Sequence, residues 1–497
     1  MKRDLEGTLP QPVRRALKKF GADIRIARLK RGLTIETLAD CVDVHRSTYS
    51  KIENGDPVVG LGLYASALFA LGLGTPHDEL VDPRRDETGL LLDLHRLPKR
   101  ARTKRDRSQV FVPIRLHSDR AAAGGQSVLR IGVLGVMSGP CAKWGLVNKY
   151  CALATAEMYN ERGGVEIEGE KFRVEISHFD DRLDPLLAAA GANQLMAKEG
   201  VRYVIGPNVE QTIGSAIPVA EKQNAMLFPY SYTRSMYAPP HENAVLGQIP
   251  GFQAGPAIYG YLRDHRGAKR LSVLAPDTPE GLRQRDETIA AAERLGLTIL
   301  SCDCTYRSGA SDVLPEVAKV IGAEPDVVVL TNLAPEDAPN LIKTARQLGY
   351  RGFLVTEAAQ DINILNRGAR SAADGLVVLG GASTVDMRSA YMEEFARRYT
   401  RIAGEWNDEA GTKAYALEII LATLGRAGKA AIQNVDRFKS TIPQFAVRNP
   451  FVKDRSSLKY VGAGYFRQKR QIGVPMVVNT VKNGNFVPLF VETLAHG

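Results

Sequence analysis

A chain of 497 residues exceeds the ~250 to 300 residues at which a single hydrophobic core stops growing, so the sequence implies at least two domains. With 44% hydrophobic and 24% charged residues, the composition excludes a wholly disordered, collagen-like or disulfide-stapled chain. Basic residues exceed acidic ones by ten, and residues 1–125 alone hold 23 Lys and Arg against 16 Asp and Glu, so most of the excess lies in the first quarter of the chain.

The first residues and the cysteines bear on the compartment and on cofactors. The N-terminus lacks the apolar stretch of a secretory signal, and no run approaches the ~18 apolar residues of a membrane span, so a cytoplasmic protein is expected. The five cysteines are an odd number without a CxxC pair, which disfavours disulfides and a zinc site. No P-loop, HExxH or dinucleotide fingerprint occurs, so no catalytic residue, metal or cofactor is expected.

Three short helices are predicted near the N-terminus. Apolar residues recur at helical spacing over 13–31, where Gly32 ends the pattern. Thr34 is the predicted N-cap of a second helix running to Cys41, and a third helix is predicted over 45–54. Two short helices around a tight turn describe a helix-turn-helix.

The residues of this segment resemble the Cro/repressor type of helix-turn-helix, which is XRE-like, over about residues 16–75. The matching motifs are Leu33-Thr34, Leu38-Ala39, Val44, Arg46-Ser47-Thr48, Ser50-Lys51-Ile52-Glu53 and Gly55. The stretch that follows is similar to antitoxin-like regulators. In the Cro/repressor family the third helix enters the major groove of DNA, and dimers read two half-sites. The resemblance therefore implies DNA as the partner of residues 1–80 and a homodimer as the binding form.

Carried over by position, the resemblance names five DNA-contacting residues. It makes Arg46, Ser47 and Ser50 candidates for base edges, and Thr34 and Lys51 candidates for phosphates. Two residues depart from the family pattern: Asp43 stands where a turn glycine is usual, and Ile35 where a phosphate-contacting glutamine is frequent.

A linker and an α/β region follow. Residues 81–127 lack periodicity and include a run with six basic residues and one acidic residue at 99–107, so they are interpreted as a basic flexible linker. Beyond it, β-rich runs alternate with helical stretches, which predicts parallel sheets covered on both faces. Strands are expected at 128–136, 172–179, 202–205, 271–275, 298–304, 327–330, 352–355 and 375–379, and helices at 148–162, 184–198, 210–224, 281–295 and 336–348. The length favours two α/β lobes facing across a cleft.

The motifs of this region resemble the solute-binding proteins for branched-chain amino acids (Leu/Ile/Val) of ABC transporters, over about residues 128–490. They are Arg130-Ile131-Gly132-Val133, Met137-Ser138-Gly139-Pro140, Trp144-Gly145, Asn160, Gly163-Gly164, Phe179-Asp180-Asp181, Asp184-Pro185 and Val204-Ile205-Gly206-Pro207. The resemblance implies the type I periplasmic-binding fold, with three crossovers between two doubly wound lobes that close on a ligand. Lobe 1 is expected at 128–252 and 382–449, and lobe 2 at 253–381 and 450–497.

The same resemblance implies a set of ligand-binding residues. Glu357 matches the acidic residue that pairs with the ligand's ammonium, although a solvated loop glutamate or a helix cap is the alternative. The segments that hold the ligand's carboxylate match Gln211, Thr212, Tyr230, Ser231 and Tyr232. The remaining candidates, at the wall and rim, are Trp144, Thr278 and Asn332. The aromatic residues, for which core packing is the alternative, extend the expected ligands from amino acids to amides and aromatic carboxylates.

Four interpretations of the whole chain remain open. The first is a DNA-binding regulator that responds to a small-molecule ligand in the cleft. The second is a transport receptor, periplasmic and partnered by an ABC-transporter permease, with a fused or mis-joined N-terminal segment. The third is an antitoxin-like DNA binder that uses the large domain as a partner surface. The fourth, an enzyme, lacks a supporting motif.

Overall fold

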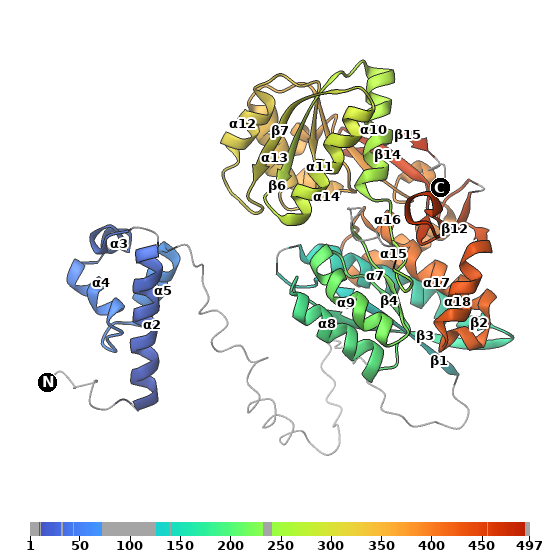
Figure 1. Cartoon of the computed structure of the whole chain (residues 1–497), viewed down its shortest axis with the longest axis horizontal. Coiled ribbons are helices and arrows are strands. Elements are labelled where there is room, and N and C mark those ends of the chain that lie inside the picture. The colour runs from blue at the N-terminus through green and yellow to red at the C-terminus, as the bar shows by residue number, and fades with distance from the viewer. Residues whose placement is uncertain are drawn as a thin grey trace, which may run out of the picture. The chain divides into compact units, whose positions relative to one another are not determined.

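The computed structural model describes residues 9, 11–30, 33–42, 44–71, 126–139, 141–231, 241–454 and 456–492 (Figure 1). It divides into two compact units, Met1–Ser118 and Asp119–Gly497. Asp43 and residues 81–125 of the expected linker lie outside the described residues. In the described part of the chain, no helix is both long and apolar enough to cross a membrane.

The first unit is helical, as expected from its periodicity. Its described helices are α2 (Gln11–Lys30), α3 (Ile35–Cys41), α4 (Arg46–Glu53) and α5 (Leu61–Ala70). Tyr49 and Ile52 of α4 are fully buried, and they pack with Ile24, Leu38 and Tyr64. The three predicted helices are confirmed, and each of their ends lies within two residues of the predicted position. The helix α5, which closes this core, was not predicted as a separate element.

Lobe 1 of the second unit is built on a sheet in the order β2-β3-β1-β4-β5. Its strands are β1 (Ser127–Gly135), β2 (Val165–Ile167), β3 (Glu170–Asp180), β4 (Tyr203–Ile205) and β5 (Met226–Phe228). Its helices are α7 (Ala142–Glu161), α8 (Pro185–Asn193), α9 (Glu210–Lys222), α15 (Ala390–Ala403), α16 (Ala410–Lys413), α17 (Tyr415–Ala427) and α18 (Val435–Thr441). Helices from distant parts of the sequence thus cover one sheet (Figure 1).

Lobe 2 is built on a sheet in the order β15-β14-β10-β9-β8-β6-β7. Its strands are β6 (Arg270–Pro276), β7 (Thr298–Tyr306), β8 (Val327–Leu330), β9 (Phe353–Thr356), β10 (Val377–Gly380), β14 (Met476–Lys482) and β15 (Asn485–Glu492). Its helices are α10 (Gly251–Arg266), α11 (Pro279–Arg294), α12 (Leu314–Ile321), α13 (Ala338–Gln347) and α14 (Ile362–Gly368). The mixed α/β architecture with parallel sheets is the predicted fold class.

Two features differ from the expectation. The sheets are not wholly parallel, because β2, β14 and β15 each pair antiparallel with a neighbour. The last passage between the lobes also comes later than residue 450. Residues 446–473 first form a small sheet of β11 (Ala446–Arg448), β12 (Ser457–Val461) and β13 (Gln471–Gly473). Tyr460 of this sheet packs against Phe438 and contacts Thr423 on the helices of lobe 1, and the chain rejoins lobe 2 at Met476.

Candidate functional site

Loops at the carboxyl ends of the strands meet between the two lobes. In parallel α/β folds, ligands bind beyond these strand ends. Here α9 of lobe 1 begins at Glu210, whose buried carboxylate pairs with Arg283 on α11 of lobe 2. The backbone N–H of Glu210 also donates to the carboxylate of Glu280, at 3.4 Å. The two helix starts therefore hold the lobes together at one point.

A second contact between the lobes forms at the start of α14. The backbone N–H of Ile362 donates to the carboxylate of Asp408 at 3.2 Å, and the side-chain amide of Asn363 donates to the carbonyl of Trp406 at 2.9 Å. Asp408 and Trp406 lie between α15 and α16, which pack on α7 of lobe 1. Residues 361–363 of lobe 2 and 406–409 of lobe 1 are thus direct neighbours.

The lobe 1 side of this region is centred on a buried ion pair. The Lys413 ammonium lies 2.9 Å from the Glu409 carboxylate, and both side chains are at most 3% exposed. The ammonium also donates to the carbonyl of Trp144, at 3.4 Å, and lies 5.9 Å from the ring centroid of Tyr230. The predicted residues Trp144 and Tyr230 are therefore brought together around a lysine that the sequence analysis missed.

The close approach of α7 to β1 explains the Trp-Gly motif. A Cβ on Gly145 would lie 2.1 Å from the carbonyl oxygen of Val136, so a side chain at this position would collide with backbone. Glycine here lets the first turn of α7, and with it Trp144, lie directly over the end of β1.

Glu357 is enclosed by lobe 2 itself. Its carboxylate, 2% exposed, accepts hydrogen bonds from four side chains: Gln284 (2.8 Å), Thr288 (2.8 and 3.0 Å), Tyr259 and Thr331. A Cβ on Gly255 of α10 would lie 2.6 Å from this carboxylate, so the helix backbone covers it. The predicted rim residue Asn332 joins the same network by donating to Gln284 at 3.1 Å. The contact of Glu357 with a ligand ammonium stays a prediction, and here these acceptors are occupied by lobe 2 donors.

The other predicted residues flank the interlobe contacts. Gln211 is exposed on α9, whereas Thr212 is buried and donates to the carbonyl of Val209 at 3.0 Å. Thr278 caps α11 by accepting from the N–H of Gly281, at 3.0 Å. Ser231 is fully buried, and Tyr232 lies outside the described residues. The structure therefore brings Trp144 and Tyr230 into one group and Asn332 and Glu357 into another.

Carboxylates from both lobes share the interlobe space. Burial, with smaller contributions from the charges of Asp408 and Glu409, raises the pKa of Asp361 to about 6. Burial also raises the pKa of Glu336, with a contribution from Glu409. The Cys141 thiol of lobe 1 has its pKa raised to about 12, first by burial and then by carboxylates of both lobes, so it stays protonated. Negative charge is therefore in excess here.

Only some of the residues at the interlobe contacts could have been predicted from the sequence. Glu357 was selected by resemblance, and Asp361, four residues later, also follows the carboxyl end of β9, where ligands bind in parallel α/β folds. Glu409 and Lys413 have the spacing of a helical ion pair, but such pairs are usually solvated and nothing local indicates that this one is buried.

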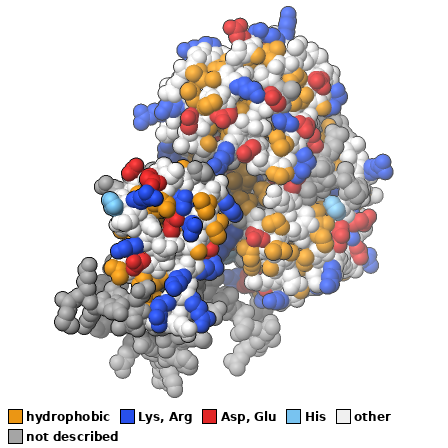
Figure 2. All heavy atoms as spheres, turned by 60° about the vertical axis from the view of Figure 1, so that its left-hand side comes forward, with side chains coloured by type: hydrophobic (Ala, Val, Ile, Leu, Met, Phe, Trp, Pro, Cys, Tyr) orange, Lys and Arg blue, Asp and Glu red, His pale blue; other side chains and the backbone are white. Residues whose placement is uncertain are grey.

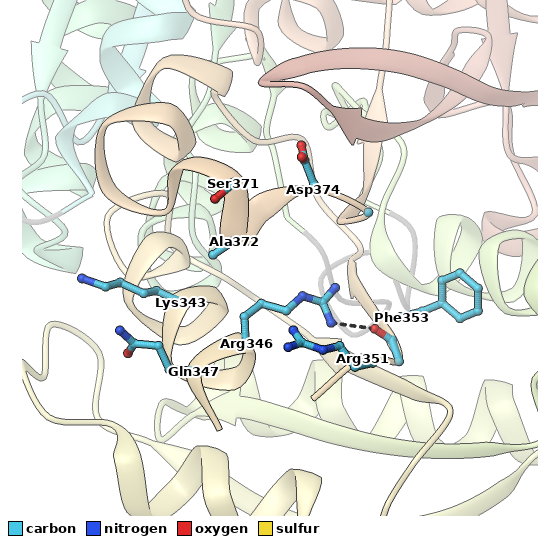
Figure 3. Close-up of a pocket in the computed structure, with 10 residues that line it drawn as sticks. Lys343, Arg346, Gln347, Arg351, Phe353, Ser371, Ala372 and Asp374 are labelled. Carbon is cyan, nitrogen blue, oxygen red and sulfur yellow. Dashed lines mark hydrogen bonds between the residues drawn. The ribbon is translucent and has the colours of Figure 1, made fainter. Parts of the chain in front are cut away.

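Two pockets lie in or beside lobe 2. One, of about 510 Å³, joins Lys143 of lobe 1 to Glu336 and the α13 and α14 side chains of lobe 2. The other, of about 540 Å³, lies where α13 faces residues 371–375 (Figure 3). There Arg346 donates to the carbonyl of Gly352 at 2.9 Å, just before β9 begins. This second pocket is thus at the amino end of the strand, away from the interlobe contacts.

Surface charge elsewhere is mixed. In Figure 2, Lys and Arg side chains are interspersed with Asp and Glu over the visible face. Among the described residues, no group of three or more His, Cys, Asp or Glu side chains is arranged to hold a metal ion.

In the helical unit, α4 presents most of the predicted DNA-contacting side chains. Arg46, Ser47 and Lys51 are exposed, and Ser50 is half-buried. Arg46 pairs with Glu36 of α3 at 2.9 Å, a surface ion pair that leaves the guanidinium accessible. Thr34 caps α3, since its hydroxyl accepts from the N–H of Thr37 at 3.1 Å.

A buried ion pair that the sequence analysis missed holds this helix in place. The guanidinium of Arg28 on α2 makes two hydrogen bonds to the Glu53 carboxylate at the end of α4, at 2.5 and 2.9 Å. A third bond, at 2.9 Å, reaches the carbonyl of Leu33. Because this bidentate pair is almost fully buried, it fixes the orientation of α4 on α2.

Comparisons with known proteins match both units. The family model described as periplasmic binding protein matches residues 128–485, and one described as helix-turn-helix domain matches residues 19–81. The Leu/Ile/Val-binding protein of Citrobacter freundii is 25% identical over 257 residues, covering 50% of this chain and 66% of that protein, just under two thirds of its length.

Solved structures support the fold. The branched-chain amino acid transporter substrate-binding protein of Streptococcus pneumoniae, in complex with isoleucine, aligns with a TM-score of 0.60 at 17% identity, covering 74% of this chain and 99% of that chain. A solute-binding protein of an ABC transporter from Rhodopseudomonas palustris, in complex with 3,4-dihydroxybenzoic acid, aligns with a TM-score of 0.61 at 17% identity, covering 74% and 98%. At these identities the likeness establishes the fold alone.

Proposed function

Because this chain belongs to the periplasmic binding protein family and carries a helix-turn-helix domain ahead of that fold, we propose that it is a ligand-responsive transcriptional regulator. One observation carries the proposal. A single polypeptide combines a helix with exposed Arg46, Ser47 and Lys51 and a pair of lobes whose strand-end loops meet. A protein of this kind acts where DNA is, in the cytoplasm, and by binding rather than by catalysis.

The proposed ligand is a small molecule held between the lobes. The relatives' names and complexes point to amino acids such as isoleucine and to aromatic carboxylates such as 3,4-dihydroxybenzoate, and amides belong to the same size class. The ring of Tyr230 and the backbone carbonyl of Trp144 lie beside the buried Lys413, and the Trp144 side chain is partly exposed. Such a mixture of apolar walls and a few oriented polar groups is what small-ligand sites use.

The proposed mechanism is a shift of population between lobe arrangements. A ligand that touches both lobes binds one arrangement more tightly, and it can shift the equilibrium only by that difference in affinity. In a homodimer, a change in lobe closure would alter the spacing of the two recognition helices, to which half-site binding is sensitive. The contacts Glu210–Arg283 and Ile362–Asp408 are the ones that such a movement would remake.

The test is DNA binding by the full chain with and without ligand. A sequence bound by the chain is first selected from random oligonucleotides, and its affinity is then measured by fluorescence anisotropy in isoleucine or 3,4-dihydroxybenzoate. The proposal expects at least one ligand to change the affinity. The matched control is the Arg46→Ala variant, which is expected to lose DNA binding while keeping ligand binding. If ligand binds and DNA affinity is the same throughout, the chain is a receptor with a fused N-terminal segment.

A further inference from the structure

We infer that the interlobe space holds an organic cation, a ligand group bearing ammonium or guanidinium N–H donors, between Asp361 of lobe 2 and Glu409 of lobe 1. The inference rests on the proposed function in taking this space as the ligand site, and it goes further by naming the chemistry that the site selects. It places the cation at residues other than Glu357.

Asp361 offers a buried carboxylate oxygen that the protein leaves unused. One oxygen of this fully buried side chain accepts from the N–H of Asn363 at 2.9 Å and so caps α14. The other oxygen has no hydrogen-bond partner among the described residues. Buried acceptors are normally satisfied, because a missing hydrogen bond costs about 1 to 3 kcal/mol. The second oxygen therefore marks a position for a donor from outside the chain.

Glu409 offers the matching oxygen from lobe 1. One of its oxygens pairs with Lys413, and the other has no hydrogen-bond partner in the part of the chain that the structure describes. The two carboxylates are close, because the residue after Asp361 donates to Asp408, the neighbour of Glu409, at 3.2 Å. Two buried acceptors without a partner among the described residues, one from each lobe, thus lie on neighbouring segments.

The charge of the surroundings selects a cation over an anion. Asp361, Asp408 and Glu409 are nine-tenths or more buried. Among the described residues, the buried Lys413 already pairs with Glu409, and the partly buried Arg388 and Lys143 act on Asp408 and Asp361 only as neighbouring charges. A carboxylate ligand placed here would add a further negative charge to a poorly solvated group. An ammonium or guanidinium supplies several N–H donors in one group and neutralises part of the excess, and charge-assisted hydrogen bonds are the stronger kind.

A pocket between the lobes lies beside α14, the helix that Asp361 caps. Its volume is about 510 Å³, and its charged lining residues are Lys143 of lobe 1 and Glu336, Lys343 and Arg367 of lobe 2. Asp361 and Glu409 do not line this pocket, but Glu409 contributes to the raised pKa of Glu336, and Lys143 opposes the rise in the pKa of Asp361, so the pocket residues and the two carboxylates lie within electrostatic range of each other. Because the donors bridge two lobes, binding of a cation would favour the arrangement in which the lobes meet.

The experiment is calorimetric titration of the full chain with agmatine, putrescine and L-arginine, beside 3,4-dihydroxybenzoate. The Asp361→Asn variant removes the charge and keeps a side-chain oxygen to cap α14, and thermal unfolding checks that it folds. The matched control is Asp181→Asn. Asp181 is likewise buried and its pKa is raised to a similar value, but it lies in lobe 1, where Asp180, Asp184 and the hydroxyl of Thr212 are its neighbours.

The inference expects at least one of the three cations to bind. It expects Asp361→Asn to weaken that binding about tenfold to a hundredfold, and Asp181→Asn to leave it unchanged. It is overturned if none of the cations binds, or if Asp361→Asn binds them as tightly as the unaltered chain. DNA affinity, measured on the same samples, tests the proposed regulatory function independently of cation binding. A cation that binds without altering DNA affinity supports this site and refutes the regulator.

Discussion

Asp361→Asn should stabilise the chain at neutral and alkaline pH although it weakens ligand binding. Burial raises the pKa of this carboxyl from its ordinary 3.8 to about 6. At ~1.4 kcal/mol for each pKa unit, the difference corresponds to about 3 kcal/mol. The folded state binds the proton more tightly than the unfolded state, so this carboxyl lowers the free energy of unfolding as pH rises from about 4 to 6. The loss then persists above pH 6. Asparagine does not titrate, so the Asp361→Asn variant does not suffer this loss of stability.

The assay is urea unfolding followed by tryptophan fluorescence. The two tryptophans of the chain, Trp144 and Trp406, both lie in the periplasmic-binding unit, so their emission reports the unfolding of that unit. The variant is expected to gain up to about 3 kcal/mol at pH 8 and to match the unaltered chain near pH 4. Asp181→Asn should show a similar gain, because the pKa of Asp181 is also raised to about 6, chiefly by burial. Equal stability of Asp361→Asn and the unaltered chain at pH 8 would refute the reasoning.

The remaining predictions concern three side chains. Arg28→Met leaves Glu53 as a buried, unpaired charge and should cost about 3 to 5 kcal/mol of stability in the helical unit, measured by hydrogen exchange. A cost below about 1 kcal/mol would contradict a rigid pair. Lys51→Ala should lower DNA affinity and reduce the slope of log affinity against log salt by about one, and an unchanged slope would remove Lys51 from the phosphate contacts. Glu357→Ala strands four buried donors at about 1 to 3 kcal/mol each, so urea unfolding should show a large loss. Intact stability with lost ligand binding would instead restore Glu357 as a ligand contact.

Local sequence patterns were sufficient for many of the elements up to residue 379 and for several of their ends, whereas no separate element was predicted beyond that residue. Thr34 was predicted as the N-cap of its helix, and the Asp184-Pro185 start of α8 matches an expected helix over 184–198. Strands such as Val327–Leu330 coincide with the expected range. These features depend on residues within a few positions of one another, so the capping contacts and the apolar spacing that define them can be recognised in a short stretch of chain.

The candidate site was predictable only in part, because its members are distant in sequence. Trp144 and Tyr230 were selected by resemblance, but Lys413, which contacts the Trp144 carbonyl and the Tyr230 ring, lies far beyond both in the sequence. Thr212 and Thr278 were selected for their hydroxyl groups, which the structure uses for a backbone carbonyl and a helix cap. Sequence states which group a residue carries, whereas packing decides whether that group is already satisfied.

The sequence by itself determined the two kinds of fold and much of the order of helices and strands up to residue 379, because periodicity, caps and turns are local properties. Only the tertiary structure decided that Glu357 is enclosed by donors of lobe 2, and that Asp361 and Glu409 meet from opposite lobes. It also decided that Arg28 and Glu53 are buried together. Burial and pairing between residues far apart in the chain depend on how the lobes and helices pack, and that packing sets which charges water no longer reaches.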